Sequence, residues 1–460
     1  MASSTKSLEV IVLAAGKGTR MRSDVPKVLH QIGGRPMLAH VLDTAHALNA
    51  SRIHVVYGHG GEKVPTVIDD NGVDWVLQEQ QHGTGHAVAQ AMPLVDSAAI
   101  ALVLYGDVPL IRKDCLKRLV QQAETGALAL LTMELPHGGA YGRIVRDTKG
   151  KIISIVEKKD ASSEQLAIRE INTGFLAAPA DNLQRWLSRL SNDNAQGEYY
   201  LTDIVAMAVD EGYSVVSQNP AKVSEIEGIN SKAELARMER IYQSEQAEAL
   251  MEQGLTLRDP ARFDLRGELS IGRDVVIDIN VIVEGKVELG DNVHIGPNTL
   301  LRDVIVGADS EVLANCVLEQ ASIGKGCRIG PFARLRPGAS LADNVHVGNF
   351  VEIKNSNVGD GSKVNHLAYV GDSKVGSKVN IGAGSITANY DGANKHQTVI
   401  EDGASVGANS VMVAPVTIGK NATLAAGTVL RKDAPADELT LSAGKQRSVK
   451  GWKRPTKNKR

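Results

Sequence analysis

Residues 323–353 read IGKGCRIGPFARLRPGASLADNVHVGNFVEI, with an aliphatic residue at every sixth position: Ile323, Ile329, Leu335, Leu341, Val347 and Ile353. The same period extends both ways, with one-residue slips, through Ile271, Ile277, Val283, Leu289, Ile295, Leu301, Val306, Val312, Leu318, Val364, Val370, Ile418, Leu424 and Leu430. A hexapeptide repeat of this length predicts a parallel β-helix, whose triangular coils have one aliphatic side chain per edge. Aromatic residues would not fit so narrow an interior, and they make up only 3% of the chain.

The repeat lapses between Ile381 and Val406, where the chain reads TANYDGANKHQT. Insertions into such repeats commonly carry binding groups. We therefore expect this segment to project from the β-helix as a loop.

Residues 8 to about 228 follow a different pattern, in which short aliphatic runs alternate with helical ones. The expected strands are LEVIVL, RIHVVYG, VDWVLQ, IALVLYGD and ALALLTM, and the expected helices include PMLAHVLDTAHAL and HAVAQAMPLV. Such alternation predicts an α/β fold with a parallel, doubly wound sheet. Ligands of these sheets bind beyond the carboxyl ends of the strands.

Residues 230–253 should form one linker helix, capped by Asn230 or Ser231 with Glu234 completing a capping box, and ended by Gly254. We therefore expect a first domain at residues 1–229, a linker helix at 230–254 and a β-helix domain at 255–460.

Composition excludes several classes of protein. Three cysteines among 460 residues argue against a disulfide framework or a zinc knuckle, and a net charge of −2 gives no reason to expect nucleic acid as a partner. No apolar run is long enough to cross a bilayer, so we expect no membrane insertion. The start MASSTKSLEV lacks an apolar signal-peptide core, which favours the cytoplasm.

The segment VIVLAAGKGTRM (10–21) runs from an aliphatic strand into a loop with two glycines. Backbone N–H groups at such a strand end can hold phosphate, and Lys17, Arg20 and Lys27 would add positive charge. A merely tight turn needs glycine but not three cations. Asp107, in LYGDVPL, follows another strand and is placed to hold Mg²⁺ together with substrate phosphates.

These motifs identify a family. The segments LAAGKGTRM, the PK at 26–27, QEQQHGTGHA and YGDVPL closely resemble those of sugar-1-phosphate nucleotidylyltransferases. With its hexapeptide repeats, the chain from about residue 8 to Pro455 resembles the bacterial bifunctional N-acetylglucosamine-1-phosphate uridylyltransferase / glucosamine-1-phosphate N-acetyltransferase family. The resemblance implies a Rossmann-like nucleotidyltransferase domain, a linker helix and a left-handed parallel β-helix.

For the first domain, the resemblance implies uridylyl transfer from UTP to N-acetylglucosamine-1-phosphate, with release of pyrophosphate. The nucleotide and sugar would be held by Leu13, Ala14, Ala15, Gly16, Lys27, Gln78, Gly83, Thr84, Tyr105, Gly106, Asp107, Gly142, Glu157, Asn172 and Asn230. Asp107 and Asn230 would share the Mg²⁺. His82 and His86 could suggest a zinc pair, but no third ligand is evident and the intervening Gly-Thr-Gly belongs to the uracil loop.

For the second domain, the resemblance implies acetyl transfer from acetyl-CoA to glucosamine-1-phosphate. His366 would be the general base, since a histidine near neutral pKa suits removal of an amine proton. The sugar phosphate would be held by Arg336, Lys354, Tyr369 and Asn380, with Lys395 nearby. Acetyl-CoA would be contacted by Ala383, Asn389, Tyr390, Ala408, Ala426 and Ala443.

Two positions depart from the family pattern, which often has serine at Ala408 and arginine at Ala443. Lys445 or Arg447 could substitute for the missing arginine. The last sixteen residues, KQRSVKGWKRPTKNKR, hold eight Lys or Arg. Such a tail is either a solvated extension or an aid in holding an anionic ligand.

The resemblance also implies a homotrimer formed through the β-helix, with acetyltransferase sites shared between subunits, and a product used in peptidoglycan and lipopolysaccharide synthesis. One alternative is a single-function nucleotidylyltransferase with a structural β-helix. Another is a non-enzymatic scaffold like certain translation-factor subunits, which would not need the intact GKGTRM motif, Lys27 and Asp107.

Overall fold

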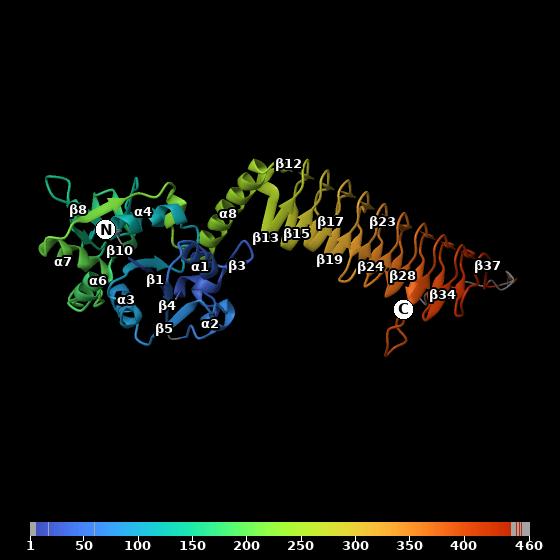
Figure 1. Cartoon of the computed structure of the whole chain (residues 1–460), viewed down its shortest axis with the longest axis horizontal. Helices are drawn as coiled ribbons and strands as arrows, with labels where there is room; N and C mark the ends of the chain where they lie inside the picture. The colour runs from blue at the N-terminus through green and yellow to red at the C-terminus, as the bar shows by residue number, and fades with distance from the viewer. Residues whose placement is uncertain are drawn as a thin grey trace, which may run out of the picture. The chain divides into compact units, whose positions relative to one another are not determined.

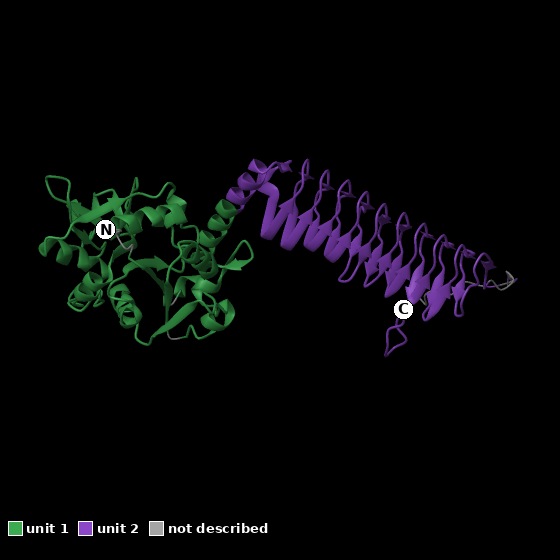
Figure 2. Cartoon of the chain, in the orientation of Figure 1, with its two compact units in different colours: residues 1–242 green, residues 243–460 purple. Residues whose placement is uncertain are grey.

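The computed structural model in Figure 1 describes residues 6–16, 18–58, 60–442, 448, 450 and 452. The chain divides into two compact units, residues 1–242 and 243–460 (Figure 2). The division falls inside helix α8 (Lys232–Glu252), which is continuous. The domain boundaries expected at residues 229 and 254 stay a prediction.

Helix α8 is capped much as the sequence predicts. The Oγ of Ser231 accepts a hydrogen bond from the Glu234 N–H at 3.2 Å. The Glu234 carboxylate reaches back to the N–H of Asn230, at 2.7 Å, rather than to that of Ser231. Gly254 follows the helix with a φ of +104°, which glycine adopts without strain. The cap therefore fixes Asn230 as well as starting the helix.

The first unit is built from short strands and helices. Its helices are α1 (Met37–Ala47), α2 (Lys63–Ile68), α3 (Thr84–Ala91), α4 (Lys113–Glu124), α5 (Ser163–Leu166), α6 (Ala180–Leu187) and α7 (Ile204–Asp210). Its strands are β1 (Leu8–Ala14), β2 (Gln31–Ile32), β3 (Arg35–Pro36), β4 (Arg52–Gly58), β5 (Val73–Gln78), β6 (Ile100–Tyr105), β7 (Leu128–Glu134), β8 (Arg143–Arg146), β9 (Ile152–Val156), β10 (Glu170–Pro179) and β11 (Val215–Gln218).

The main sheet has the strand order β11-β7-β10-β6-β1-β4-β5. Side chains of β1 alternate between two cores: Val10 and Val12 pack with α1 and α4, whereas Ile11 and Leu13 pack with α3, α6 and α7. The predicted doubly wound α/β fold is therefore confirmed. The expectation of a purely parallel sheet is wrong at β10, which runs antiparallel to both β6 and β7.

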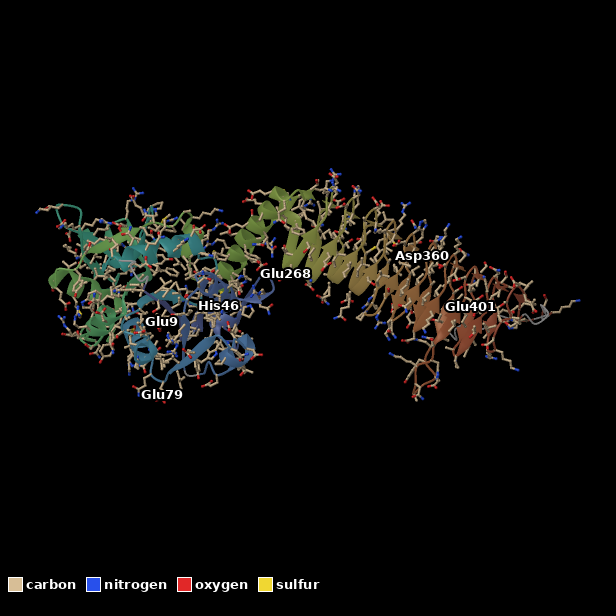
Figure 3. The ribbon with its side chains drawn as sticks, in the orientation of Figure 1. Glu9, His46, Glu79, Glu268, Asp360 and Glu401 are labelled. Atoms are coloured by element: carbon tan, nitrogen blue, oxygen red, sulfur yellow. The ribbon has the colours of Figure 1, made fainter. Side chains whose placement is uncertain are left out.

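A buried histidine contacts carboxylates on two neighbouring strands of the sheet. The imidazole of His54, on β4, has no exposed side-chain surface, and its Nε2 lies 2.9 Å from the carboxylate of Glu9 on β1. Figure 3 labels Glu9 in the first unit. The Nδ1 of His54 lies 3.2 Å from the carboxylate of Asp74 on β5. Two of these strands, β1 and β5, carry loops of the first candidate site at their carboxyl ends.

We expect His54→Ala to lower the free energy of unfolding by about 3 to 5 kcal/mol, because it leaves the Glu9 carboxylate buried without its partner. Denaturant unfolding followed by tryptophan fluorescence measures the change. His46→Ala is the matched control, since His46 forms a partly exposed pair with Asp70 and should cost at most about 1 kcal/mol. Equal effects from the two substitutions would contradict the prediction.

The second unit is a parallel β-helix, as the repeat predicts. One row of strands pairs from coil to coil: β12 (Thr256–Leu257), β14 (Val276–Ile277), β16 (His294–Ile295), β18 (Glu311–Val312), β20 (Arg328–Ile329), β23 (His346–Asn349), β26 (Lys363–His366), β29 (Asn380–Ile381), β32 (Ser405–Val406), β35 (Thr423–Leu424) and β37 (Leu439–Thr440).

The other sheet starts with long strands that each cover two edges of a coil: β13 (Phe263–Ile271), β15 (Val281–Leu289), β17 (Leu300–Val306) and β19 (Val317–Ile323). After β19 it divides into two rows. One is β21 (Arg334–Leu335), β24 (Glu352–Lys354), β27 (Tyr369–Gly371), β30 (Ile386–Ala388), β33 (Val411–Val413) and β36 (Val429–Leu430). The other is β22 (Ser340–Leu341), β25 (Asn357–Val358), β28 (Ser373–Val375), β31 (Thr398–Ile400) and β34 (Val416–Ile418).

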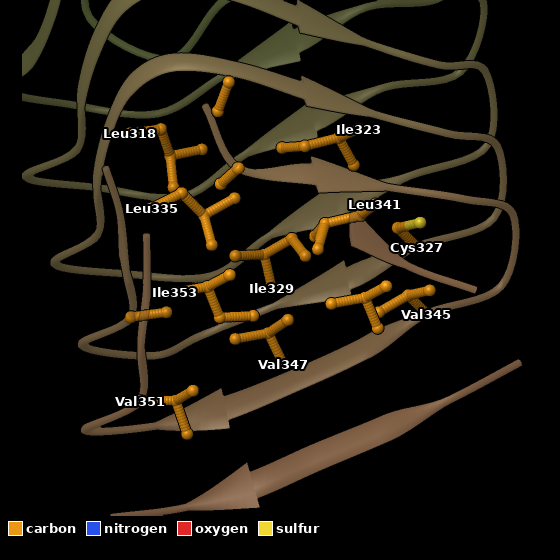
Figure 4. Packing of buried hydrophobic residues seen from close by; sticks show 14 of the residues in the cluster. Leu318, Ile323, Cys327, Ile329, Leu335, Leu341, Val345, Val347, Val351 and Ile353 are labelled. Carbon is orange, nitrogen blue, oxygen red and sulfur yellow. The ribbon is translucent and has the colours of Figure 1, made fainter. Parts of the chain in front are cut away.

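The six-residue frame gives the core of this unit. Its aliphatic side chains stack along the axis, as Leu318, Leu335 and Ile353 do in Figure 4. Every residue of the predicted frame is buried except Ile271, which is partly buried. The prediction of a packed hexapeptide interior is confirmed.

The expected loop is also present. Residues 389–397 leave the β-helix between β30 and β31 and project from it (Figure 1). An antiparallel bridge between Tyr390 and Lys395 closes the loop, and the His396 imidazole lies 2.7 Å from the carboxylate of Asp391. No helix among the described residues is both long and apolar enough to span a membrane.

Candidate active sites

The first candidate site lies at the carboxyl ends of β1, β5 and β6. A cavity of about 250 Å³ is lined by Leu13, Ala14, Ala15, Gly16, Lys27, Val28, Gln78, Gln81, Gly83, Thr84, Ala87, Tyr105, Asp107 and Glu198. Nearly all of the predicted nucleotide residues thus come together. Gly106 does not line the cavity; its N–H donates to the Leu13 carbonyl at 2.9 Å and joins β6 to β1. Arg20 is exposed beside this loop, and Lys17 lies outside the described residues.

A second cavity of about 200 Å³ shares Thr84 and Tyr105 with the first. The predicted sugar residues Gly142, Glu157 and Asn172 line it. The Thr202 hydroxyl donates to the Glu157 carboxylate at 3.1 Å, and burial raises the pKa of that carboxyl group. Burial also raises the pKa of Tyr105, which therefore stays a neutral phenol between the two cavities. The cavities predicted to hold the nucleotide and the sugar are thus adjacent.

A lysine joins the two predicted magnesium ligands. The ammonium of Lys27 forms an ion pair with the Asp107 carboxylate and donates to the Asn230 side-chain oxygen at 2.7 Å. The Asp107 carboxylate oxygen and the Asn230 amide oxygen therefore both contact the Lys27 ammonium group. Oxygen ligands of this kind suit Mg²⁺, which takes one or two protein ligands and completes its shell with water and phosphate. The described residues contain no cluster of three or more His, Cys, Asp or Glu side chains suited to a metal.

The two histidines of the segment QEQQHGTGHA, His82 and His86, contact glutamines. The Gln78 amide nitrogen lies 2.8 Å from Nδ1 of His86 and 3.4 Å from the Gly83 carbonyl. Burial, together with the positive charge of His82 when protonated, lowers the pKa of His86. The Gln78 nitrogen therefore faces two protein groups, of which the Gly83 carbonyl is an acceptor. The buried amide of Gln78 thus presents its oxygen to a ligand.

The second candidate site lies on the β-helix. His366 ends β26, and its Nδ1 lies 3.0 Å from the Asn349 side-chain oxygen on the preceding coil. An amide oxygen only accepts, so Nδ1 carries the proton and Nε2 keeps its lone pair. Asn349 thereby sets the tautomer that a general base needs. Sequence reasoning missed Asn349, because only the coil register places it beside His366.

A ladder of ion pairs runs along another row of strands in the same unit. Arg302 bonds the carboxylate of Glu319 at 2.8 Å and also pairs with Glu284. The strand register places Arg336 after Glu319 and Lys354 after Arg336, so two cations follow one another. Arg336 bonds Glu352 at 2.8 Å, on the strand that also carries Lys354. The alternation of acidic and basic residues along this row therefore ends at Arg336 and Lys354, the two residues predicted to hold phosphate.

The projecting loop adds a further cation to this group. Lys354 lowers the pKa of Lys395 by hydrogen bonding and by charge repulsion, so the two ammonium groups are neighbours. The Asn389 amide donates to Tyr369 Oη at 3.4 Å and to the Asp372 carboxylate. Like charges held close together without full neutralisation favour an anionic ligand.

Three of the predicted acetyl-CoA residues lie in one column of the β-helix together with His366, and the others lie elsewhere or outside the described residues. His366, Ala383, Ala408 and Ala426 occupy equivalent positions on successive coils: the N–H groups of Gly384, Asn409 and Gly427 bond the carbonyls of His366, Ala383 and Ala408 at 3.2, 2.7 and 2.8 Å. Tyr390 is 62% exposed on the loop. Asn380 is exposed, and among the described residues it shows no hydrogen bond to Arg336, Lys354 or Tyr369. Ala443, Lys445 and Arg447 lie outside the described residues.

Comparison with known proteins adds family information. Residues 10–142 match a family model described as the MobA-like NTP transferase domain. Residues 269–303, 320–355 and 397–432 match the bacterial transferase hexapeptide model. Bifunctional protein GlmU of Methylococcus capsulatus is 55% identical over 453 residues, and that of Nitrosospira multiformis is 56% identical over 451 residues; each match covers 98% of both chains.

Bifunctional protein GlmU of Azoarcus sp. is likewise 56% identical over 452 residues, covering 98% of this chain and all of that protein. Among solved structures, UDP-glucose pyrophosphorylase complexed with UDP-glucose covers 52% of this chain and 99% of its own, with 16% identity and a TM-score of 0.43. That likeness is too weak to bear on either site.

Proposed function

This chain belongs to the bifunctional GlmU protein family, and we propose on that premise how its two units divide two group transfers. The chain is both a glucosamine-1-phosphate acetyltransferase and an N-acetylglucosamine-1-phosphate uridylyltransferase, and it makes UDP-N-acetylglucosamine in two steps. The alternative of one activity with a purely structural β-helix is not favoured, because the full-length relatives are bifunctional. The alternative of a non-enzymatic scaffold protein is not favoured for the same reason.

The paired cavities of the first unit carry the uridylyl-transfer proposal. Uracil would lie near Gln78, whose free amide oxygen accepts the N3–H that uracil has and cytosine lacks. The sugar would occupy the neighbouring cavity beside Glu157 and Asn172. Lys27, which lines the first cavity and pairs with Asp107, would stabilise negative charge on the transferred phosphoryl group. A sugar phosphate oxygen then attacks the α-phosphorus, and pyrophosphate leaves.

Asp107 and Asn230 would hold the Mg²⁺, which would supply charge neutralisation on the nucleotide phosphates when bound. The capping interaction of α8 keeps Asn230 in position for this role. Lys27, which contacts both of these oxygens, would bind the nucleotide phosphates. No covalent enzyme intermediate is needed, because positioning and charge neutralisation suffice.

For acetyl transfer, we assign the general base to Nε2 of His366. It takes a proton from the glucosamine-1-phosphate amine as the amine nitrogen attacks the thioester carbonyl, and the CoA sulfur leaves as thiolate and is reprotonated. Arg336, Lys354 and Lys395 would hold the sugar phosphate. The column of small residues Ala383, Ala408 and Ala426 would let the CoA chain lie along the coil corner.

We also propose a homotrimer formed through the β-helix. Phe332, Phe350 and Leu367 occupy one column of coil corners with left-handed φ values of 57°, 55° and 49°, in a column that otherwise holds Asn and Gly. They are 49, 56 and 64% exposed in the single chain, and the two Phe rings stack at 5.2 Å. Large apolar side chains in such positions favour burial against another subunit.

We expect the double substitution Phe332→Glu with Phe350→Glu to convert the protein to monomers in size-exclusion chromatography with light scattering. Acetylation should fall with it, whereas uridylyl transfer should persist, because its cavities lie within one chain. Asn298→Glu, which adds the same charge at an exposed corner of that column, is the control. A trimer that survives both Phe substitutions would overturn the assignment of this interface.

The two activities are tested on the purified full chain. Acetyl-CoA and glucosamine-1-phosphate should release free thiol, and UTP with N-acetylglucosamine-1-phosphate and Mg²⁺ should release pyrophosphate. Absence of thiol release alone would leave only the uridylyl function. We place the reaction in the cytoplasm, where both co-substrates are made, and propose that its product feeds cell-envelope synthesis.

A further inference from the structure

Gln81 joins the phosphate loop to a second glycine-containing segment. It comes from the stretch after β5, and its amide N–H donates to the carbonyl of Ala15, in the loop after β1. Gly58, the last residue of β4, packs against both partners: a Cβ there would overlap the Gln81 amide and come within 2.7 Å of the Ala15 oxygen. Three strand ends thus meet at one hydrogen bond.

The bonded carbonyl belongs to the Ala15–Gly16 peptide. In a trans peptide the C=O and the following N–H point in opposite directions, so a carbonyl held toward Gln81 turns the Gly16 N–H away from it. Gly16 is exposed, and a Cβ there would meet nothing within 4 Å. The bond from Gln81 and the close approach of Gly58 both act on the Ala15 carbonyl, so they bear directly on the orientation of this peptide plane.

The orientation of the Ala15–Gly16 peptide decides whether the loop attracts or repels an anion such as phosphate. Ala15, Gly16, Lys27 and Gln81 line the nucleotide cavity and also a neighbouring cavity of about 220 Å³ on the side of Gly58 and Gly61. With the N–H turned inward, the loop attracts phosphate; with the peptide reversed, a carbonyl oxygen would repel it.

We propose that Gln81 is a positioning residue that locks the Ala15–Gly16 peptide so that the Gly16 N–H donates to a phosphate of the bound nucleotide. The inference rests on the proposed uridylyl function. Gln81 touches the loop and not the reacting atoms. Its neighbour Gln80 is exposed and contacts His82, and it shows no hydrogen bond to the described residues of the loop.

The test replaces Gln81 with methionine, which keeps the chain length and removes the N–H donor. Titration calorimetry on the full-length protein compares UTP with uridine, which lacks phosphates. We expect Gln81→Met to weaken UTP binding about tenfold, the effect of losing a hydrogen bond to a charged group, and to leave uridine binding unchanged. The KM for UTP should rise, while acetyl transfer and melting temperature stay as in the unmodified protein.

Gly58→Ala perturbs the same bond while leaving Gln81 present, because its methyl group would overlap the Gln81 amide and press on the Ala15 carbonyl. It should show the same loss for UTP alone, and combining it with Gln81→Met should add little. Gln80→Met, the matched control, should bind both ligands normally.

Equal losses for uridine and UTP would overturn the proposal, since Gln81 would then contact the base. Unchanged UTP binding in Gln81→Met would overturn it as well. If the unmodified protein binds no UTP, the uridylyl function itself fails, which is a separate result.

Discussion

His366→Ala is expected to lower the rate of glucosamine-1-phosphate acetylation by about 10² to 10⁴, the range that one general base contributes. Nδ1 of His366 is held by Asn349 at 3.0 Å, which leaves Nε2 to take the amine proton. Alanine removes that acceptor without disturbing the coil, because the side chain is exposed at the end of β26. Thiol release from acetyl-CoA measures the effect.

Uridylyl transfer provides an internal control for this substitution. It should be unchanged in His366→Ala, since its cavities are built from residues of the first unit. His294→Ala, which alters another exposed histidine in the same row of strands, should leave both rates near normal. Acetylation that persists at the normal rate in His366→Ala would assign the base to another group.

Asp107→Asn should reduce uridylyl transfer by about 10² to 10³, comparable with the loss of one preorganised electrostatic contact in other enzymes. Asparagine keeps the shape of the side chain but removes the charge that pairs with Lys27 and that would hold Mg²⁺. The Mg²⁺ concentration that gives half the maximal rate should also rise. Pyrophosphate release over a magnesium titration measures both effects.

Acetyl transfer by the same variant should be unaffected. Asp114→Asn is the matched control, since Asp114 is exposed in the first turn of α4 and lies outside both cavities. If Asp107→Asn kept its rate and its magnesium dependence, the metal site would have to lie elsewhere.

Some features of the fold were predictable because they depend on near neighbours. Residues six apart, such as Ile329 and Leu335, are buried on successive edges of a coil, so a periodic sequence is enough to indicate the interior. The strands of the first unit follow from aliphatic runs, and Gly254 ends α8 as its backbone freedom suggests. The direction of β10 was not predictable, because a strand carries the same pattern whichever way its neighbours run.

The candidate sites, like the fold, were predictable only in part from the sequence. Motifs such as LAAGKG place Leu13 to Gly16 on one loop, and the structure gathers them around one cavity. Their roles in binding stay predictions. Gln81 and its neighbour Gln80 are the same residue type in the sequence, yet only Gln81 reaches the Ala15 carbonyl. Asn349 looks like an ordinary coil asparagine until the register sets it beside His366.

By itself, therefore, the sequence determined the two architectures, the joining helix and the loops that carry polar residues, because hydrophobic period and turn chemistry act over a few residues. Only the tertiary structure decided which side chains meet. Lys27 and Asn230, for example, are 203 positions apart, and the hydrogen bond between them exists because the segment before α8 packs beside Asp107, where the Ile229 N–H donates to the Asp107 carbonyl. Such long-range contacts depend on the packing of whole elements, which no local pattern encodes.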